Sequence, residues 1–180
     1  KKYDLIIVAD YGHGMISSKI ANFISKEKNF LSLNAQINST NIGLHNIDKY
    51  KKINNLVINA GELRHEMNQR EGDIINLAKQ YKKIVNCKYL GVTQGKKGAF
   101  IIDEKNKVHS CPAFMIEAKD KVGAGDAFLS LISLFNFKKI DINLSIFIAS
   151  IAAAKSADTI GNKIPVYKNE ILKIISHTLK

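Results

Sequence analysis

Arginine is scarce in this sequence, although lysine is abundant. Lysine and arginine together number 27 against 16 acidic residues, giving a formal net charge of +11, yet only Arg64 and Arg70 are arginines. Proteins that read base edges rely on the forked guanidinium group, and the lysines here are spread along the whole chain. We therefore expect no specific nucleic-acid partner and attribute the charge to an AT-rich genome, because Ile and Asn are abundant too.

Cysteine and long apolar runs are also scarce. Cys87 and Cys111 lie far apart without metal-ligand spacing, which indicates a reduced, cytoplasmic protein. The longest apolar stretch, residues 144–154, is interrupted by Ser145 and Ser150 and is too short to cross a bilayer. The histidines show no zinc-ligand spacing, and no serine lies in a G-x-S-x-G elbow. We expect no membrane partner, no zinc site and no serine hydrolase.

The length and composition predict a folded protein. A chain of 180 residues with 46% hydrophobic residues can bury a substantial core, so we expect residues 1–180 to form a single domain. No Pro-rich or Ser-rich tract indicates long disorder. An apolar strand follows Lys1-Lys2-Tyr3 almost at once, without an initiator Met or a lead-in loop. We therefore expect the sequence to be an excerpt of a longer protein.

Strand patterns and helix patterns alternate along most of the chain. β-rich runs predict strands at residues 5–9, 30–34, 55–59 and 89–93, and apolar-faced segments predict helices after Ser17-Ser18 and at 72–82, 123–137, 142–158 and 166–179. The Asn-rich connection around Ile42-Gly43-Leu44 predicts no element. Residues 99–102 and 108–111, around a polar turn, predict a β-hairpin. The fold class is α/β, a mainly parallel sheet flanked by helices with a β-hairpin segment toward the C-terminus.

The strongest local signal is Gly123-Ala124-Gly125-Asp126, at the start of a long predicted helix. Small residues there leave backbone N–H groups bare, and the helix dipole favours an anion at the same place. Asp126 can accept the proton of a hydroxyl as its oxygen attacks phosphorus, while the amides stabilise the transferring charge. Alternatively, the glycines make a tight turn and Asp126 complements the helix dipole.

Three further motifs follow predicted strands. Asn59-Ala60-Gly61-Glu62 follows the third strand, where a plain helix cap is the alternative interpretation. Thr93-Gln94-Gly95-Lys96-Lys97-Gly98 follows the fourth strand and, by itself, equally indicates a hairpin turn. Asp10-Tyr11-Gly12-His13-Gly14 ends the first strand.

In this order and spacing, the motifs resemble those of the ribokinase-like (PfkB) carbohydrate kinases. The resemblance covers essentially the whole chain, but only the C-terminal part of such a kinase. It implies a ribokinase-like fold whose N-terminal part and lid are missing from this chain. The roles it implies are a catalytic base at Asp126, an anion hole at Gly123, Ala124 and Gly125, water-bound Mg²⁺ at Asn59 and Glu62, and nucleotide binding at Thr93, Gly95 and Gly98.

The resemblance also bears on the substrate and on a second cation. The motif at Asp10 resembles the heptose-phosphate kinase branch and implies a substrate role for Asp10, although His13 stands where that branch often has Lys. Asp120 matches an aspartate that helps to bind a monovalent cation such as K⁺ in several relatives, and Val122 replaces a frequent Thr or Ser. The implied activity is ATP-dependent phosphorylation of a sugar or sugar-phosphate hydroxyl, with Mg²⁺. The resemblance allows a homodimer.

Two alternatives stay open at this point. One is a kinase of the same fold that acts on a non-sugar alcohol, such as a pyrimidine vitamin; the combination of Asn59 and Glu62 with Gly-Ala-Gly-Asp argues against it. The other is a non-catalytic nucleotide-binding or assembly module of a protein that fuses a kinase to a nucleotidyltransferase. The retained Asp126 argues against lost catalysis.

We predict that the isolated 180-residue chain binds ATP–Mg²⁺ weakly and phosphorylates no sugar at a useful rate. Holding donor and acceptor in line supplies ~7–11 kcal/mol of barrier reduction, and the segments that grip the sugar are expected to lie outside this chain. The measurement is coupled ADP release with pentoses, hexoses and heptose phosphates, on the isolated chain and on the full-length protein. Equal sugar-dependent turnover by both would contradict the prediction.

Overall fold

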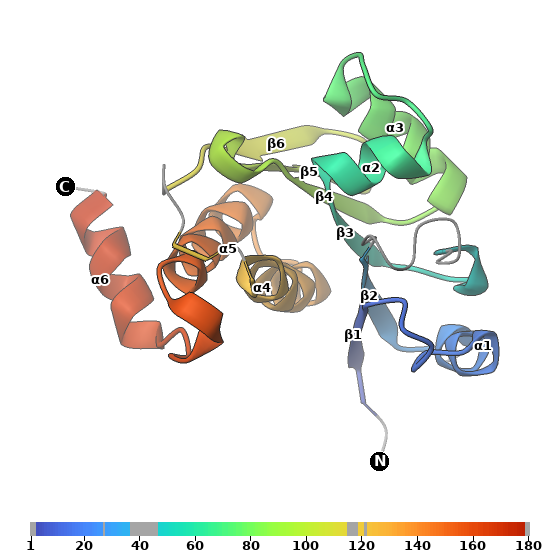
Figure 1. The fold of residues 1–180 in the computed structure, drawn as a ribbon, viewed down its shortest axis with the longest axis horizontal. Helices are drawn as coiled ribbons and strands as arrows, with labels where there is room; N and C mark the ends of the chain where they lie inside the picture. Colours follow the sequence, from blue (N-terminus) through green and yellow to red (C-terminus); the bar gives the residue numbers. More distant parts are fainter. Residues whose placement is uncertain (1–2, 27, 37–46, 115–118, 121, 179–180) are drawn as a thin grey trace. The chain divides into compact units, whose positions relative to one another are not determined.

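Figure 1 shows the computed structural model of the chain, which describes residues 3–26, 28–36, 47–114, 119–120 and 122–178. Six strands form one sheet in the order β1-β2-β3-β4-β5-β6. The chain divides into two compact units, which are described separately. Unit 1 comprises residues 1–93 and 101–108, and unit 2 comprises residues 94–100 and 109–180. That the whole chain forms a single domain stays a prediction.

Four parallel strands form the centre of unit 1: β1 (Leu5–Asp10), β2 (Phe30–Ala35), β3 (Asn55–Asn59) and β4 (Tyr89–Thr93). Leu33, Leu56 and Leu90 in β2, β3 and β4 are completely buried, as expected for strands inside a parallel sheet, whereas Ile7 in the edge strand β1 is 42% exposed. Asp10 pairs with Ala35, and Asn59 pairs with Thr93, so the carboxyl ends of the strands lie at one edge. The predicted parallel strands are confirmed.

Three helices connect these strands: α1 (Ser18–Lys26), α2 (Ala60–Glu66) and α3 (Ile74–Val85). They lie on one side of the unit 1 strands in Figure 1, because successive right-handed crossovers in one direction place their helices on the same face. A short 3₁₀ helix, η1 (Ile47–Lys49), precedes β3. Residues 37–46, which include Ile42-Gly43-Leu44, lie outside the described residues.

The sequence predicted the helices better than their ends. Asp73 caps α3, accepting the Asn76 N–H at 2.7 Å, so the helix begins two residues after the expected start at residue 72. It continues past residue 82 to Val85, where Asn86 adopts a left-handed conformation with φ of 54° and ends it. The pattern at Asn59 to Glu62 was interpreted as a ligand motif, with a helix cap as the alternative, and no helix range was predicted there; the structure has the helix α2.

The predicted hairpin is formed by β5 (Ala99–Ile102) and β6 (Val108–Cys111), which are neighbours in the sheet. The Asp103 N–H donates to the Lys107 carbonyl at 3.0 Å across the turn. The Asp103 carboxylate also accepts the N–H groups of Lys105 and Lys107, both at 2.9 Å. A side chain therefore satisfies the donors of a turn that has no glycine.

The helical part of unit 2 consists of α4 (Ala124–Lys138), α5 (Ile142–Ala157) and α6 (Lys168–Thr178), with 3₁₀ turns η2 (Gly95–Lys97) and η3 (Ile160–Asn162). Phe128 and Ile132 of α4 and Ile146 and Ile151 of α5 are completely buried. Within the described ranges, no helix combines the length and apolar character that crossing a bilayer requires.

Gly98 is fixed by close packing at the start of the hairpin. Its φ is 91° and its ψ is −140°, a region that only glycine adopts readily. A Cβ at this position would lie 2.1 Å from the Cys111 carbonyl oxygen and 2.7 Å from the Pro112 carbonyl carbon. Gly95, three residues earlier, also has a positive φ, of 57°, but no atom of the described residues lies within 4 Å of a Cβ built there.

We predict that Gly98→Ala lowers the free energy of unfolding by at least ~2 kcal/mol, because the methyl group meets backbone atoms and the backbone conformation is strained. The matched change Gly95→Ala costs about 1 kcal/mol, the price of a left-handed backbone alone. Urea unfolding of the full-length protein, followed by far-ultraviolet circular dichroism, measures both values. Equal losses of unfolding free energy in the two variants would show that close packing is not what requires glycine at position 98.

Candidate active site

The end of β3 carries the first predicted motif, and there the structure forms a capping box. The Asn59 side chain accepts the Glu62 N–H at 2.9 Å, and the Glu62 carboxylate accepts the Asn59 N–H at 2.9 Å. Glu62 is buried, whereas Asn59 is exposed. The helix-cap interpretation is therefore confirmed. Binding of metal-bound water is a separate role for the same oxygen atoms and stays a prediction.

The loop after β4 carries the second motif. Thr93 ends β4 opposite Asn59, so these two residues lie side by side at the carboxyl edge. The loop then closes on itself: Gln94 N–H donates to the Gly98 carbonyl at 2.7 Å, and Gly98 N–H donates to the Gly95 carbonyl at 3.0 Å. The turn interpretation is thus confirmed. As far as the described residues show, there is room for a ligand beside Gly95.

Asp10 ends β1 at the same edge and is buried, with 3% of its surface exposed. Its Oδ1 accepts the Gly12 N–H at 3.0 Å, and its Oδ2 accepts the Tyr50 hydroxyl at 2.7 Å and pairs with Lys49 Nζ at 2.6 Å. Burial alone would raise the pKa of Asp10, but the hydrogen bonds from Lys49, Tyr50 and Gly12 outweigh it and lower the pKa below its usual value. Burial and the neighbouring Asp10 carboxylate strongly raise the pKa of Tyr50.

In unit 2, α4 begins differently from α2, α3 and α5. Asn59, Asp73 and Asp141 cap those three helices with side-chain oxygens. The residue that caps α4 is Gly123, with φ of 84°, and no side chain makes a cap hydrogen bond there. Gly123 thus supplies no side-chain cap to the first N–H groups of α4, and together with the helix dipole these groups suit an anion.

Asp126 occupies the third position of α4, and its side chain is partly exposed. Gly125, just before it, has no described atom within 4 Å of a Cβ built on its backbone. Its backbone also avoids the left-handed region, so neither packing nor conformation requires glycine at position 125. A glycine that the fold does not need is suited to the close approach of a ligand to the backbone.

Asp120 holds the loop before α4 to the turn after α5. Its Oδ1 accepts the Val122 N–H at 3.0 Å, and its Oδ2 accepts the Gly161 N–H at 2.8 Å. The Asp120 N–H donates to the Ala157 carbonyl at 3.1 Å, and Lys119 pairs with Asp158 at 2.8 Å. Asp120 thus positions the segment that leads into Gly123, whatever else its oxygens bind.

The predicted site residues fall into two sets. Asp10, Asn59 and Thr93 share the carboxyl edge of the unit 1 sheet, with Glu62 one turn into α2. Asp120 and residues 123–126 lie close together along the chain in unit 2, which also contains Gly95 and Gly98. Sequence reasoning missed the partners that hold these residues in place: Lys49 and Tyr50 at Asp10, and Gly161 at Asp120. Tyr50 and Gly161 lie 40 and 41 positions from the aspartates they bind, so no local pattern could have revealed them.

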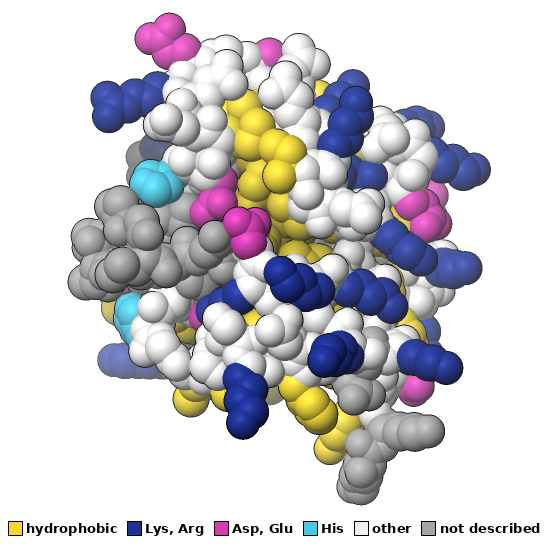
Figure 2. All heavy atoms as spheres, turned by 90° about the vertical axis from the view of Figure 1, so that its right-hand side faces the viewer, with side chains coloured by type: hydrophobic (Ala, Val, Ile, Leu, Met, Phe, Trp, Pro, Cys, Tyr) yellow, Lys and Arg dark blue, Asp and Glu magenta, His cyan; other side chains and the backbone are white. Residues whose placement is uncertain are grey.

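The basic side chains on one face of the molecule are drawn in Figure 2. They stand apart, with uncharged atoms between most of them, and they do not merge into one continuous basic surface. A scattered arrangement gives a diffuse field rather than a groove that follows a phosphate backbone. The face drawn is consistent with the expectation of no specific nucleic-acid partner, which stays a prediction.

Solved structures show the fold. The chain superposes on 2-dehydro-3-deoxygluconokinase from Thermotoga maritima with a TM-score of 0.79 and 15% identity, covering 96% of this chain and 60% of that protein. Phosphofructokinase-2 from Escherichia coli, in complex with potassium, gives a TM-score of 0.74 and 13% identity over 98% of this chain and 57% of that one. The predicted ribokinase-like fold is confirmed.

Curated relatives and a family model agree with the fold. The bifunctional protein HldE of Aliarcobacter butzleri is 27% identical over 165 residues, which cover 90% of this chain but 34% of that protein. HldE of Campylobacter curvus is 28% identical over the same shares of both proteins. The chain therefore spans about a third of the length of these relatives. The model of the pfkB family carbohydrate kinases matches residues 38–167, more than half of the sequence, and the chain belongs to that family.

Proposed function

We propose that this chain supplies the phosphoryl-transfer part of an ATP-dependent kinase that acts on a hydroxyl of a sugar or sugar phosphate. The observation that supports this most directly is the start of α4. It has a glycine cap without a side-chain hydrogen bond, open space over Gly125, and a carboxylate at the third helical position. Residues that can hold the phosphoryl group and a carboxylate that can take the proton of the acceptor hydroxyl are therefore adjacent in the sequence. Phosphoryl transfer to a hydroxyl requires both.

In the proposed reaction, Asp126 accepts the proton of the acceptor hydroxyl while the hydroxyl oxygen bonds to the γ-phosphorus of ATP. The bond between that phosphorus and the bridging oxygen breaks, and ADP leaves. The N–H groups at Gly123, Ala124 and Gly125 hold the charge of the transferring group. The left-handed conformation of Gly123 and the bonds of Asp120 to Val122 and Gly161 fix these donors before the substrate arrives.

Mg²⁺ would neutralise phosphate charge when bound with the nucleotide. Asn59 and Glu62 provide an amide and a carboxylate oxygen, ligands that suit Mg²⁺ and its bound water. The capping box fixes both side chains at the end of β3. We assign Thr93, Gly95 and Gly98 to the nucleotide loop. A K⁺ ion beside Asp120 is part of the proposal, and potassium is present in the related phosphofructokinase-2 structure.

The alternative is a nucleotide-binding or assembly module without catalysis, within a protein that fuses a kinase to a nucleotidyltransferase. The relatives named HldE are bifunctional, which favours a fused context for this chain. It does not favour loss of catalysis, because the base and the uncapped helix start are both present. A variant at the base separates the two possibilities.

We predict that Asp126→Asn lowers phosphoryl transfer by the full-length protein by at least ~100-fold, the usual scale for a lost general base. The amide keeps the shape of the side chain, and loss of one charge at a helix start costs only about 0.3–1 kcal/mol. Nucleotide affinity and the unfolding temperature should therefore change little. Single-turnover transfer, calorimetric titration with ATP–Mg²⁺ and thermal unfolding measure the three quantities.

Asp141→Asn is the matched control for this variant. Asp141 caps α5 in the same unit, accepting the Leu144 N–H at 3.0 Å, and asparagine caps helices equally well. The control should retain full transfer activity. Transfer by Asp126→Asn within a few-fold of the parent would remove Asp126 from the mechanism and favour the non-catalytic module.

A further inference from the structure

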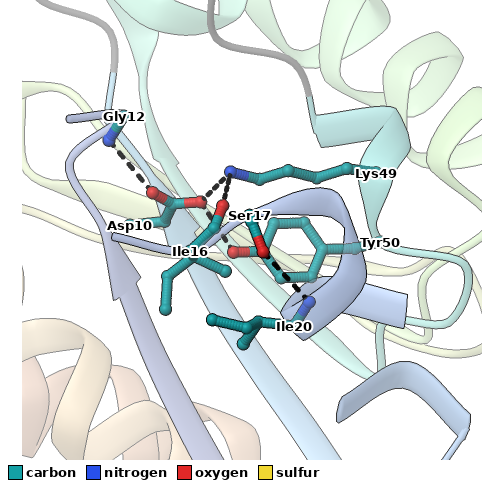
Figure 3. A network of polar contacts seen from close by, with 7 residues as sticks. All are labelled: Asp10, Gly12, Ile16, Ser17, Ile20, Lys49 and Tyr50. Carbon is teal, nitrogen blue, oxygen red and sulfur yellow. Dashed lines mark hydrogen bonds and ion pairs between the residues drawn. The ribbon is translucent and has the colours of Figure 1, made fainter. Parts of the chain in front are cut away.

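The proposed phosphoryl chemistry leaves one buried network without a role, the network around Asp10 shown in Figure 3. Its members come from three places in unit 1: the end of β1, the loop from Tyr11 to Ser17, and η1 with the residue that follows it. Asp10 and Lys49 form an ion pair at 2.6 Å, with side chains only 3% and 16% exposed. Burying such a pair costs desolvation free energy. We therefore ask which part of the structure this ion pair holds in place.

The network holds the loop after β1 at both ends. At the start of the loop, the Gly12 N–H donates to Asp10 Oδ1 at 3.0 Å. At its end, Lys49 Nζ donates to the Ile16 carbonyl at 2.8 Å while it pairs with Asp10. Figure 3 shows Lys49 reaching between these two groups. The ammonium group thus joins the end of β1 to the last turn of the loop before α1.

The same aspartate also fixes the neighbouring strand and η1. The backbone carbonyl of Asp10 accepts the Gln36 N–H at 2.9 Å, just after β2 ends. The Tyr50 hydroxyl donates to Asp10 Oδ2 at 2.7 Å, and Lys49 Nζ lies 5.4 Å from the centre of the Tyr50 ring. Removing one partner would leave a buried charge or a buried polar group without its bond, which is costly.

The loop held in this way lies where a ligand is expected. Ligands of open parallel sheets bind outside the carboxyl ends of the strands, and Asp10 is the last residue of β1. The carboxylate itself is buried beneath its three partners. Tyr11 and His13, on the loop, are exposed instead, and their hydroxyl and imidazole groups can bond to hydroxyl or phosphate oxygens.

We propose that Asp10, Lys49 and Tyr50 are positioning residues for the acceptor: they fix the loop, and Tyr11 and His13 on that loop contact the sugar or sugar phosphate. The proposal rests on the proposed kinase function and deepens it. The family resemblance gave Asp10 a substrate role. Here Asp10 still serves the substrate, but through the loop and without touching the acceptor.

A double-mutant cycle on the full-length protein tests this idea. Asp10→Asn and Lys49→Met should each raise the KM for the acceptor about tenfold or more, since small misplacements at a site are costly, with ATP affinity within twofold of the parent. The acceptor KM of the double variant should be no higher than that of the poorer single variant, because both changes break the same ion pair. Lys52→Met, at an exposed lysine nearby, is the control and should change nothing.

Two milder variants keep the test decisive if the ion-pair variants unfold. Tyr50→Phe removes only a hydroxyl and should raise the acceptor KM in the same direction. His13→Ala should raise the acceptor KM as well, while the hydrogen exchange of the loop amides stays at the parent rate. A raised acceptor KM for Asp10→Asn alone, or effects that multiply in the double variant, would mean that Asp10 contacts the acceptor directly and would overturn the proposal.

Hydrogen exchange separates this proposal from the kinase function itself. The amides of residues 11–17 should exchange at least about tenfold faster in Lys49→Met and Tyr50→Phe than in the parent and in Lys52→Met. That result needs no acceptor. If loop exchange is faster in the two variants but the parent transfers phosphate to no sugar, the kinase function is refuted while the loop anchor stands. Unchanged loop exchange would refute the anchor, whatever the activity.

Discussion

The hydrogen-bond ladder of the four parallel strands is the constraint on which the rest of unit 1 depends. Parallel strands need a crossover after each strand, so each strand from β1 to β3 is followed by a turn at the same edge. The register places Asp10 beside Ala35 and Asn59 beside Thr93. The backbone register alone thus gathers residues far apart in sequence at one edge. The few residues that follow each strand can therefore form a functional site without changes elsewhere in the sheet.

Aspartates fix a turn at the end of β1, the hairpin turn between β5 and β6, and the loop before α4. Asp10 accepts the Gly12 N–H, Asp103 accepts two N–H groups of the hairpin turn, and Asp120 accepts those of Val122 and Gly161. A carboxylate suits this task because it offers several acceptor sites on a short side chain. At Asp10 and Asp120 the second partner lies far along the chain, so the same residue that shapes a turn also ties two distant segments together.

Contiguous patterns in the sequence predicted much of the fold, whereas bonds between distant residues could not be predicted. Strand positions and the hairpin were predictable, because continuous apolar runs such as β3 and β4 are unlike the polar turns between them. The start of α4 was predictable because glycine and aspartate there form a contiguous pattern. The short helix α2 was missed because a capping box and a ligand motif have the same residues at Asn59 and Glu62. The anchors Lys49 and Tyr50 were missed because nothing local distinguishes one lysine from the many others.

The starts of α2 and α4 differ in what their cap residues supply. Both helices have an acidic residue at the third position, Glu62 and Asp126. Glu62 is long enough to reach back and accept the N–H of its cap residue, and Asn59 returns the bond, so this start is closed by its own side chains. In α4 the acidic residue is the shorter aspartate. Its cap residue, Gly123, has no side chain that could accept a backbone N–H as Asn59 does. The proposed function uses this difference: the helix dipole at the start of α4 would attract the phosphoryl group, and Asp126 is the proposed base beside it. A glutamate at position 126 would have the length that lets Glu62 bond back to its own cap residue, and a carboxylate held in that way would be less available as the proposed base.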